Sequence, residues 1–375
     1  MKQQRSYALD IIKLLLSYVI AFFHCGLSVS PGPTVTVQVF FILSGFFLGK
    51  TFYEKQSQSY SAWDYTLDHA KKIYPYYFFS CAVFFLYVFA RDAVSLALSP
   101  SLSGLGELIR SIYNQIPDVL LLQSSMFFHD SVNYPLWQLS ALLIAGYFVF
   151  ALLRQNEPLA RNILFPAAIL MIQSLLWSGV DLWENWGPFY IPLLRAFSPL
   201  CIGVMTYYFS TTAVYNRLRS HRRAFDIAGL LCLISLFAYA DYRNIFLMTT
   251  PVWLLSCLDP ESLLCRILNR PRFRKAGKLS LAIYCNHAFV IRILTALLIP
   301  RLERAGIAVP DIAKGAMLFV LLTAYSLFTL WLVPKICTKG PLLPGEGGPG
   351  AARDGGGGDK CKLRRDFGER KKLHP

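Results

Sequence analysis

The chain has 375 residues, of which 55% are hydrophobic and only 16% are charged. Soluble domains average about 25% charged residues, and the mean hydropathy here is +0.43. These values exclude a disordered chain, a coiled coil and an ordinary soluble globule. They predict an all-α polytopic membrane protein. The nine cysteines form no C-x-x-C pair and no metal-like pattern with histidine, so we expect no metal site.

A membrane-spanning helix needs about 20 mostly apolar residues. Ten runs reach or approach that length, and the eighth is the weakest because it is short and contains Pro251. The runs are 8–28, 34–52, 74–97, 134–153, 162–179, 189–209, 224–240, 244–258, 279–299 and 315–333. Lys13 interrupts the first run, and no small-residue cleavage site stands out. We therefore predict a retained span and not a signal peptide.

The distribution of cations predicts the topology. With the N-terminus in the cytoplasm, 28 of the 37 Lys and Arg residues fall in cytoplasmic segments and six in outside loops. This excess predicts about ten spans with both termini cytoplasmic, in the inner (plasma) membrane. It also explains the net charge of +15, because cations beside anionic lipid need no nucleic acid as partner.

Two stretches are not predicted to span. Residues 91–133 form a long outside connection, whose weakly amphipathic part 105–128 either lies at the interface or re-enters the membrane. Residues 339–375 are rich in Gly and Pro and then basic, so we expect a disordered tail after a membrane domain of residues 1–338. We find no internal repeat.

The first span carries an aligned polar stripe. An ionisable group at bilayer depth is costly and therefore suggests function. Lys13 and His24 are eleven residues apart, which places them on one helix face about 16 Å apart along the axis. Asp10 and Ser17 extend the stripe. The alternative is that Lys13 reaches the inner interface and His24 merely caps the outer end.

Other polar positions can be interpreted either as functional residues or as residues that only pack or anchor helices. The Ser44-Gly45 step, set among phenylalanines, lets another helix or a ligand approach closely. Lys72 lies two residues before a Tyr-Pro pair. The alternative interpretation is that it anchors the helix at the cytoplasmic surface of the membrane. His287 is expected near the middle of the ninth span, where a neutral histidine often bridges helices. Arg195 in the sixth span and Arg292 in the ninth span need partners.

Five motifs in this order resemble the integral-membrane acyltransferase 3 family, whose bacterial members O-acylate cell-surface glycans. The match covers about residues 5–334. The motifs are the basic residue and histidine of Lys13 and His24, Phe-Phe-x-x-Ser-Gly-Phe at 40–46, Lys-x-Tyr-Pro at 72–75, Leu-Trp-x-Leu-Ser at 136–140, and Ser-x-x-x-Tyr-x-x-His at 280–287. The chain departs from the family at His69-Ala70-Lys71-Lys72, where the family has Arg-x-x-Arg before Tyr-Pro, and at Leu142, where many larger members carry Glu.

The resemblance implies an acyl-CoA donor, with acetyl-CoA as the first candidate, as a substrate on the cytoplasmic side, and a hydroxyl of a glycan or lipid-linked sugar as acceptor, with no other cofactor. Acyl transfer needs a base, and histidine titrates near neutrality, so His24 is the candidate general base. Lys13 would hold a CoA phosphate or stabilise the oxyanion, beside Asp10 at the cytoplasmic mouth. The candidate substrate-binding residues are Ser17, Ser44, Lys72, Trp137, Arg195, Tyr284 and His287.

Two rival functions remain open. An exporter of a glycan or lipid-linked sugar would also have many spans and buried charges. It should show repeat symmetry and paired broken helices, and neither is clear in the sequence. A membrane scaffold would use the same polar residues only for packing, and replacement of His24 would leave its function intact.

Overall fold

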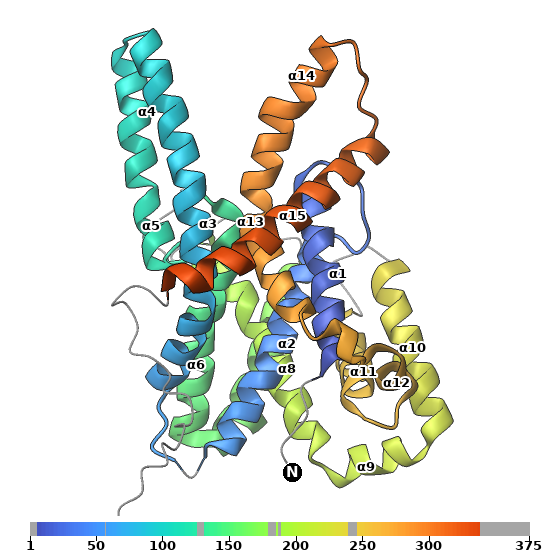
Figure 1. The fold of residues 1–375 in the computed structure, drawn as a ribbon. Helices are drawn as coiled ribbons and strands as arrows, with labels where there is room; N and C mark the ends of the chain where they lie inside the picture. Colours follow the sequence, from blue (N-terminus) through green and yellow to red (C-terminus); the bar gives the residue numbers. More distant parts are fainter. Residues whose placement is uncertain are drawn as a thin grey trace, which may run out of the picture.

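The computed structural model describes residues 6–56, 58–125, 131–178, 185–186, 189–238 and 246–337. Helices dominate this part of the chain (Figure 1). The strands there are two residues each, β1 (Asn185–Trp186) and β2 (Phe189–Tyr190), paired antiparallel. The helical fold class is confirmed. The tail from residue 339 lies outside the described residues.

The helices follow one another along the chain with short connections. The α-helices are α1 (Tyr7–His24), α2 (Pro33–Glu54), α3 (Ala62–Leu98), α4 (Leu102–Tyr113), α5 (Gln115–Leu120), α6 (Trp137–Leu159), α7 (Phe165–Trp177), α8 (Ile191–Ser210), α9 (Ala213–Ser220), α10 (Arg222–Ala238), α11 (Phe246–Leu258), α12 (Leu263–Leu268), α13 (Ala276–Ile293), α14 (Ile299–Arg304) and α15 (Asp311–Cys337). Short 3₁₀ or π turns are η1 (Tyr134–Leu136), η2 (Ala160–Leu164), η3 (Pro271–Phe273) and η4 (Leu294–Leu298).

Six helical runs in the described residues are long and apolar enough to cross a membrane. They are 7–24, 33–54, 62–98, 134–175, 271–304 and 311–337. The fourth run contains two of the expected spans, which meet near Asn156, where the backbone leaves helical geometry (φ −155°, ψ 88°). The eighth expected span is a short apolar helix. The protein is therefore a multi-pass membrane protein, and the count of ten stays a prediction.

The centre of the molecule is the contact between α2 and α8. A Cβ atom added at Gly45 would overlap the carbonyl of Leu200, and one at Gly203 would overlap the carbonyl of Ile42. Only glycine allows the two backbones to lie this close. The small residue amid aromatics in α2 is thus a site of close helix approach.

Two arms of helices project from the rest of the molecule (Figure 1). One arm is the upper part of α3 with α4 and α5 beside it, and the other is the run from α13 to α14. α1 packs along α13, and α15 crosses α13 and reaches α3. Large apolar side chains such as Leu170, Met171 and Leu231 are exposed, as expected for helices that face lipid.

The connection at 91–133 is largely helical and not a loop. α3 continues to Leu98, and α4 folds back along it. The chain then returns inward, where the backbone N–H of Ser124 donates to Ser140 and the Ser124 hydroxyl donates to the carbonyl of Trp137 at 2.7 Å. Ser124 is fully buried, so this end of the connection lies in the protein interior.

Candidate functional site

Two histidines from different helices meet at the C-terminal end of α1. His24 is the last residue of α1, and its ring centroid lies 5.3 Å from that of His287 in α13, with the ring planes tilted by 32°. The sequence analysis placed His24 at the end of its span and His287 near the middle of its own. The two rings lie side by side because α13, η4 and α14 form one helical run to Arg304. That run extends well beyond the end of α1.

The environment of His287 fixes its tautomer. Its Nδ1 lies 2.6 Å from the backbone carbonyl oxygen of Tyr284. Because a carbonyl oxygen only accepts, Nδ1 carries the hydrogen and Nε2 carries the lone pair of the neutral ring. The residue is fully buried, and Nε2 has no hydrogen-bond partner among the described residues. A fixed acceptor nitrogen therefore lies beside His24.

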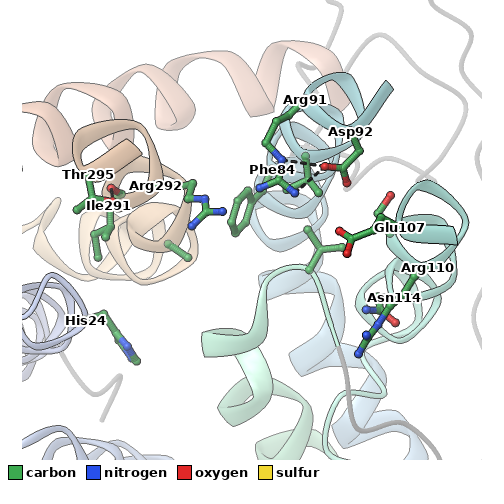
Figure 2. A pocket seen from close by; sticks show the side chains of 14 residues that line it. His24, Phe84, Arg91, Asp92, Glu107, Arg110, Asn114, Ile291, Arg292 and Thr295 are labelled. Carbon is green, nitrogen blue, oxygen red and sulfur yellow. Dashed lines mark hydrogen bonds and ion pairs between the residues drawn. The ribbon is translucent and has the colours of Figure 1, made fainter. Parts of the chain in front are cut away.

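A wide cavity opens on one side of His24 (Figure 2). It has a volume of about 560 Å³ and lies between α1, α3, α4 and α13. His24 is exposed within it. Several charged residues line the cavity, namely Arg91, Asp92, Glu107, Arg110 and Arg292. A hydrated polar molecule can thus reach the His24 imidazole from this side.

A narrow cavity lies on the other side of His24. Its volume is about 50 Å³, and Ile20, Val37, Trp137, Arg195 and Tyr284 contribute to its walls. A single water needs about 10–15 Å³ of such space, so this cavity has room for a few waters or a short acyl group. Three of the residues predicted to bind substrate, from α6, α8 and α13, therefore share one cavity with His24.

Arg195 places a positive charge in the narrow cavity. The residue is only 2% exposed, and its guanidinium carbon lies 5.6 Å from the centre of the Trp137 ring. A buried guanidinium is held in the low-dielectric interior, where its interaction with a developing negative charge is stronger than in water. The arrangement is suited to stabilise an oxyanion next to His24.

Hydrogen bonds from both flanks hold the segment of α13 that carries His287. The Tyr284 hydroxyl donates to the carbonyl of Pro135 at 2.7 Å. The Ser80 hydroxyl donates to the carbonyl of Cys285 at 2.5 Å, and Asn286 donates to Thr329 at 3.0 Å. These bonds join α13 to η1, α3 and α15. They keep the His287 ring in one place, as a positioning role requires.

Asp118, which organises the inner end of the connection at 91–133, was not predicted from the sequence. Asp118 in α5 is fully buried, and its carboxylate accepts from the backbone N–H groups of Val132 and Asn133 at 2.8 and 3.0 Å. Its backbone carbonyl accepts from the Tyr77 hydroxyl at 2.6 Å. Burial raises the pKa of the Asp118 carboxyl, and the donors oppose that shift. No periodicity marks this position, because its partners lie on other segments.

The polar stripe of α1 divides between two neighbouring helices. The Ser17 hydroxyl lies 2.8 Å from that of Ser280 in α13, on the same contact as His24 and His287. Lys13 is half-buried and its Nζ lies 5.1 Å from the centre of the Phe47 ring in α2. Asp10 is buried at 9% exposure. The stripe thus faces protein along its length.

Ser44 and Lys72 do not line either cavity beside His24. The Ser44 hydroxyl donates to the carbonyl of Phe40 at 2.8 Å within its own helix. Lys72 is exposed near the start of α3. In the described ranges, no group of three or more His, Cys, Asp or Glu side chains is arranged to hold a metal ion.

From sequence, Arg292 was noted as an ionisable residue within a span, but the other charged residues of the wide cavity were not singled out. Arg91 and Arg110 counted only as outside cations, and Asp92 and Glu107 were not noted. The available signal was that cations are scarce on the outside of membrane proteins. Their gathering depends on α4 folding back on α3, which the sequence pattern did not predict.

Comparison with known proteins agrees with this geometry. A family model described as an acyltransferase domain, that of the acyltransferase 3 family, matches residues 6–333. No curated protein and no solved structure matches the chain. The match includes both histidines and every residue that lines the two cavities. The chain therefore belongs to the acyltransferase 3 family and is a membrane acyltransferase.

Proposed function

We propose that the protein transfers an acyl group, in the first place acetyl, from acyl-CoA in the cytoplasm to a hydroxyl of a cell-surface or lipid-linked glycan. The acceptor occupies the wide cavity and the acyl group the narrow one. His24 lies between them as the general base. The observation that carries the proposal is the position of His24, exposed between the two cavities with the buried ring of His287 against it.

The reaction follows from this arrangement. His24 takes the proton of the acceptor hydroxyl as its oxygen attacks the thioester carbonyl, which forms a tetrahedral oxyanion. The Arg195 guanidinium stabilises that negative charge. When the intermediate collapses, the carbon–sulfur bond breaks and the imidazolium of His24 returns the proton to the leaving thiolate. The products are the glycan ester and free CoA, so atoms and charges balance.

His287 acts through His24 and is a positioning residue. Its Nδ1–H donates to the Tyr284 carbonyl, so its Nε2 lone pair is available to the group beside it. An acceptor nitrogen next to His24 favours the protonated form that His24 adopts during transfer. The support from Ser80, Asn286 and Tyr284 holds this nitrogen in place.

Lys13 serves the donor in this proposal. It lies eleven residues before His24 on one continuous helix, which is about 16 Å along the axis. The extended pantetheine arm of CoA has a similar reach. A phosphate held near Lys13 would allow the thioester to reach the narrow cavity, and Asp10 at the same end would orient the lysine. A cytoplasmic donor could then serve an acceptor on the outside.

The topology belongs to the same proposal. We propose about ten spans, both termini cytoplasmic and residence in the inner (plasma) membrane, on the basis of the cation distribution. A reporter fused after Pro334 should be active only in its cytoplasmic form. A periplasmic signal there would remove at least one span, most readily the short segment at 244–258.

The activity is tested with the purified full chain in lipid nanodiscs. Isotope-labelled acetyl-CoA is added with surface glycan from cells that lack the gene, and mass spectrometry follows the label. We expect label on the glycan as an alkali-labile ester and an equal release of CoA. No transfer with wild-type protein would contradict the proposal, and uptake of the glycan into proteoliposomes without acetylation would support an exporter.

A further inference from the structure

The wide cavity gathers arginines on the side of the membrane where cations are scarce. Under the proposed topology, the outside loops contain six Lys and Arg residues. Two of them, Arg91 and Arg110, line this one cavity, together with Arg292 from the ninth span. Such a concentration opposes the usual distribution, and arginine is the side chain best suited to bind carboxylates and phosphates.

The charged side chains that line the cavity, counted among the described residues, include more cations than anions. Arg91 is bound to Asp92, with Nε and a terminal nitrogen 2.8 and 2.6 Å from Oδ1. Arg292 makes no ion pair within the described ranges, and its side chain is exposed. Figure 2 shows Arg292 extending from α13 on one side, and Glu107 and Arg110 from α4 on the other. Among the described residues that line the cavity, three arginines therefore face two carboxylates.

The position of Arg292 relative to the histidines is suited to a sugar. Arg292 lines the same cavity as His24, and it lies about 7.5 Å beyond His287 along the axis of α13. One pyranose ring with its substituent spans a comparable length. A sugar whose hydroxyl lies at His24 can therefore reach Arg292 with a charged group on the same or the next ring.

We propose that the wide cavity selects an acceptor that carries an oxyanion beside the hydroxyl to be acylated, and that Arg292 is the residue that reads it. The oxyanion is the carboxylate of an acidic sugar or the phosphate of a phosphorylated one, since a guanidinium binds both through paired N–H groups. Glu107 accepts from a neighbouring sugar hydroxyl. This inference rests on the proposed function for its link to acylation, but the binding it predicts is independent of that reaction.

Three monosaccharide probes test the selection with the full chain in nanodiscs. Methyl β-glucuronide supplies a carboxylate, glucose 6-phosphate supplies a phosphate, and methyl β-glucoside is the neutral reference. Binding is measured by calorimetry, and acetyl transfer to each probe is measured separately. The variants are Arg292→Gln, Arg292→Lys and the matched control Arg301→Gln, an exposed arginine of α14 that does not line the cavity.

We expect at least one anionic probe to bind about tenfold or more tightly than the neutral one. Arg292→Gln should abolish that preference, Arg292→Lys should keep part of it, and Arg301→Gln should keep all of it. Equal or weaker binding of both anionic probes, or a preference that survives Arg292→Gln, would overturn the inference. Preferential binding without acetyl transfer would instead contradict the proposed function. The stronger anionic probe identifies carboxylate or phosphate as the group recognised.

Discussion

The two cavities that meet at His24 differ in size, in polarity and in what surrounds them. The wide one has about 560 Å³ and charged walls, and three of its arginines come from α3, α4 and α13. The narrow one has about 50 Å³ and mostly apolar walls, with Arg195 as its charged residue. Since a sugar needs space and polar partners while an acetyl group needs neither, the difference supports the proposed placement of the two reactants on opposite sides of one imidazole.

Replacement of the residue that the cavities share should have the largest effect. His24→Ala removes the base, so we expect the rate of acyl transfer to fall by about 10²–10⁴-fold. Insertion and folding should be retained, because the side chain is exposed. The rate is measured in nanodiscs beside the elution profile of the protein. His221→Ala, a change at an exposed histidine after α9, is the control and should keep the wild-type rate. A His24→Ala variant near that rate would contradict the assignment.

The narrow cavity predicts selectivity for short acyl chains. Val37→Ala enlarges this cavity, so the rate with butyryl-CoA relative to acetyl-CoA should rise by about 10–100-fold. Val39→Ala, on the same helix at a buried position that does not line the cavity, is the matched control. Competition between the two donors in one reaction gives the ratio. If both variants behaved alike, or if the wild type used both donors equally, the acyl group would not lie in this cavity.

The donor end of α1 should affect affinity more than turnover. Lys13→Ala should raise the apparent KM for acetyl-CoA by about tenfold and change kcat little, because the proposed contact is to a phosphate of bound donor. Lys13→Arg should keep most of the activity, since a positive charge is enough for a single contact to the phosphate. Lys50→Ala, which removes a surface pair to Glu54 at 3.7 Å, is the control. A fall in kcat with constant KM would assign Lys13 to the chemical step.

Loss of the single hydrogen bond made by the Tyr284 hydroxyl should give the smallest effect. Tyr284→Phe removes the hydrogen bond to Pro135 but keeps the ring. We expect the free energy of unfolding to fall by about 0.5–1.5 kcal/mol, and the rate to change by less than about threefold. Tyr325→Phe is the control, because this hydroxyl is buried without a hydrogen-bond partner in the described part of the chain. Thermal unfolding of both variants in nanodiscs checks the difference, and an equal loss in both would contradict it.

Sequence pattern predicted much of this structure because the bilayer imposes simple rules. Apolar runs of about 20 residues gave helices, and eleven-residue spacing placed Lys13 and His24 on one helix. The motifs around Trp137, Tyr284 and His287 identified residues that share a site with His24. Periodicity can do this because each of these residues lies on a regular helix.

The rest depends on contacts that periodicity does not encode. The pairing of His24 with His287 follows from the way α1 packs along α13, a contact that also brings Ser17 to Ser280. The charged wall of the wide cavity follows from α4 folding back on α3. Both features depend on how helices are placed relative to one another, and a single sequence gives only the helices themselves.

The most direct test of the central claim is a double-mutant cycle on the two histidines. Acyl transfer and thermal stability are measured for the wild type, His24→Ala, His287→Ala and the double variant in one nanodisc preparation. Because His287 acts through His24, His287→Ala should lose about 10–100-fold with lowered stability, and the double variant should be no slower than His24→Ala within about threefold. If the rate loss of the double variant equalled the product of the two single losses, the claim would be contradicted. A His24→Ala variant with near wild-type rate beside a His287→Ala variant that is inactive but stably folded would also contradict it.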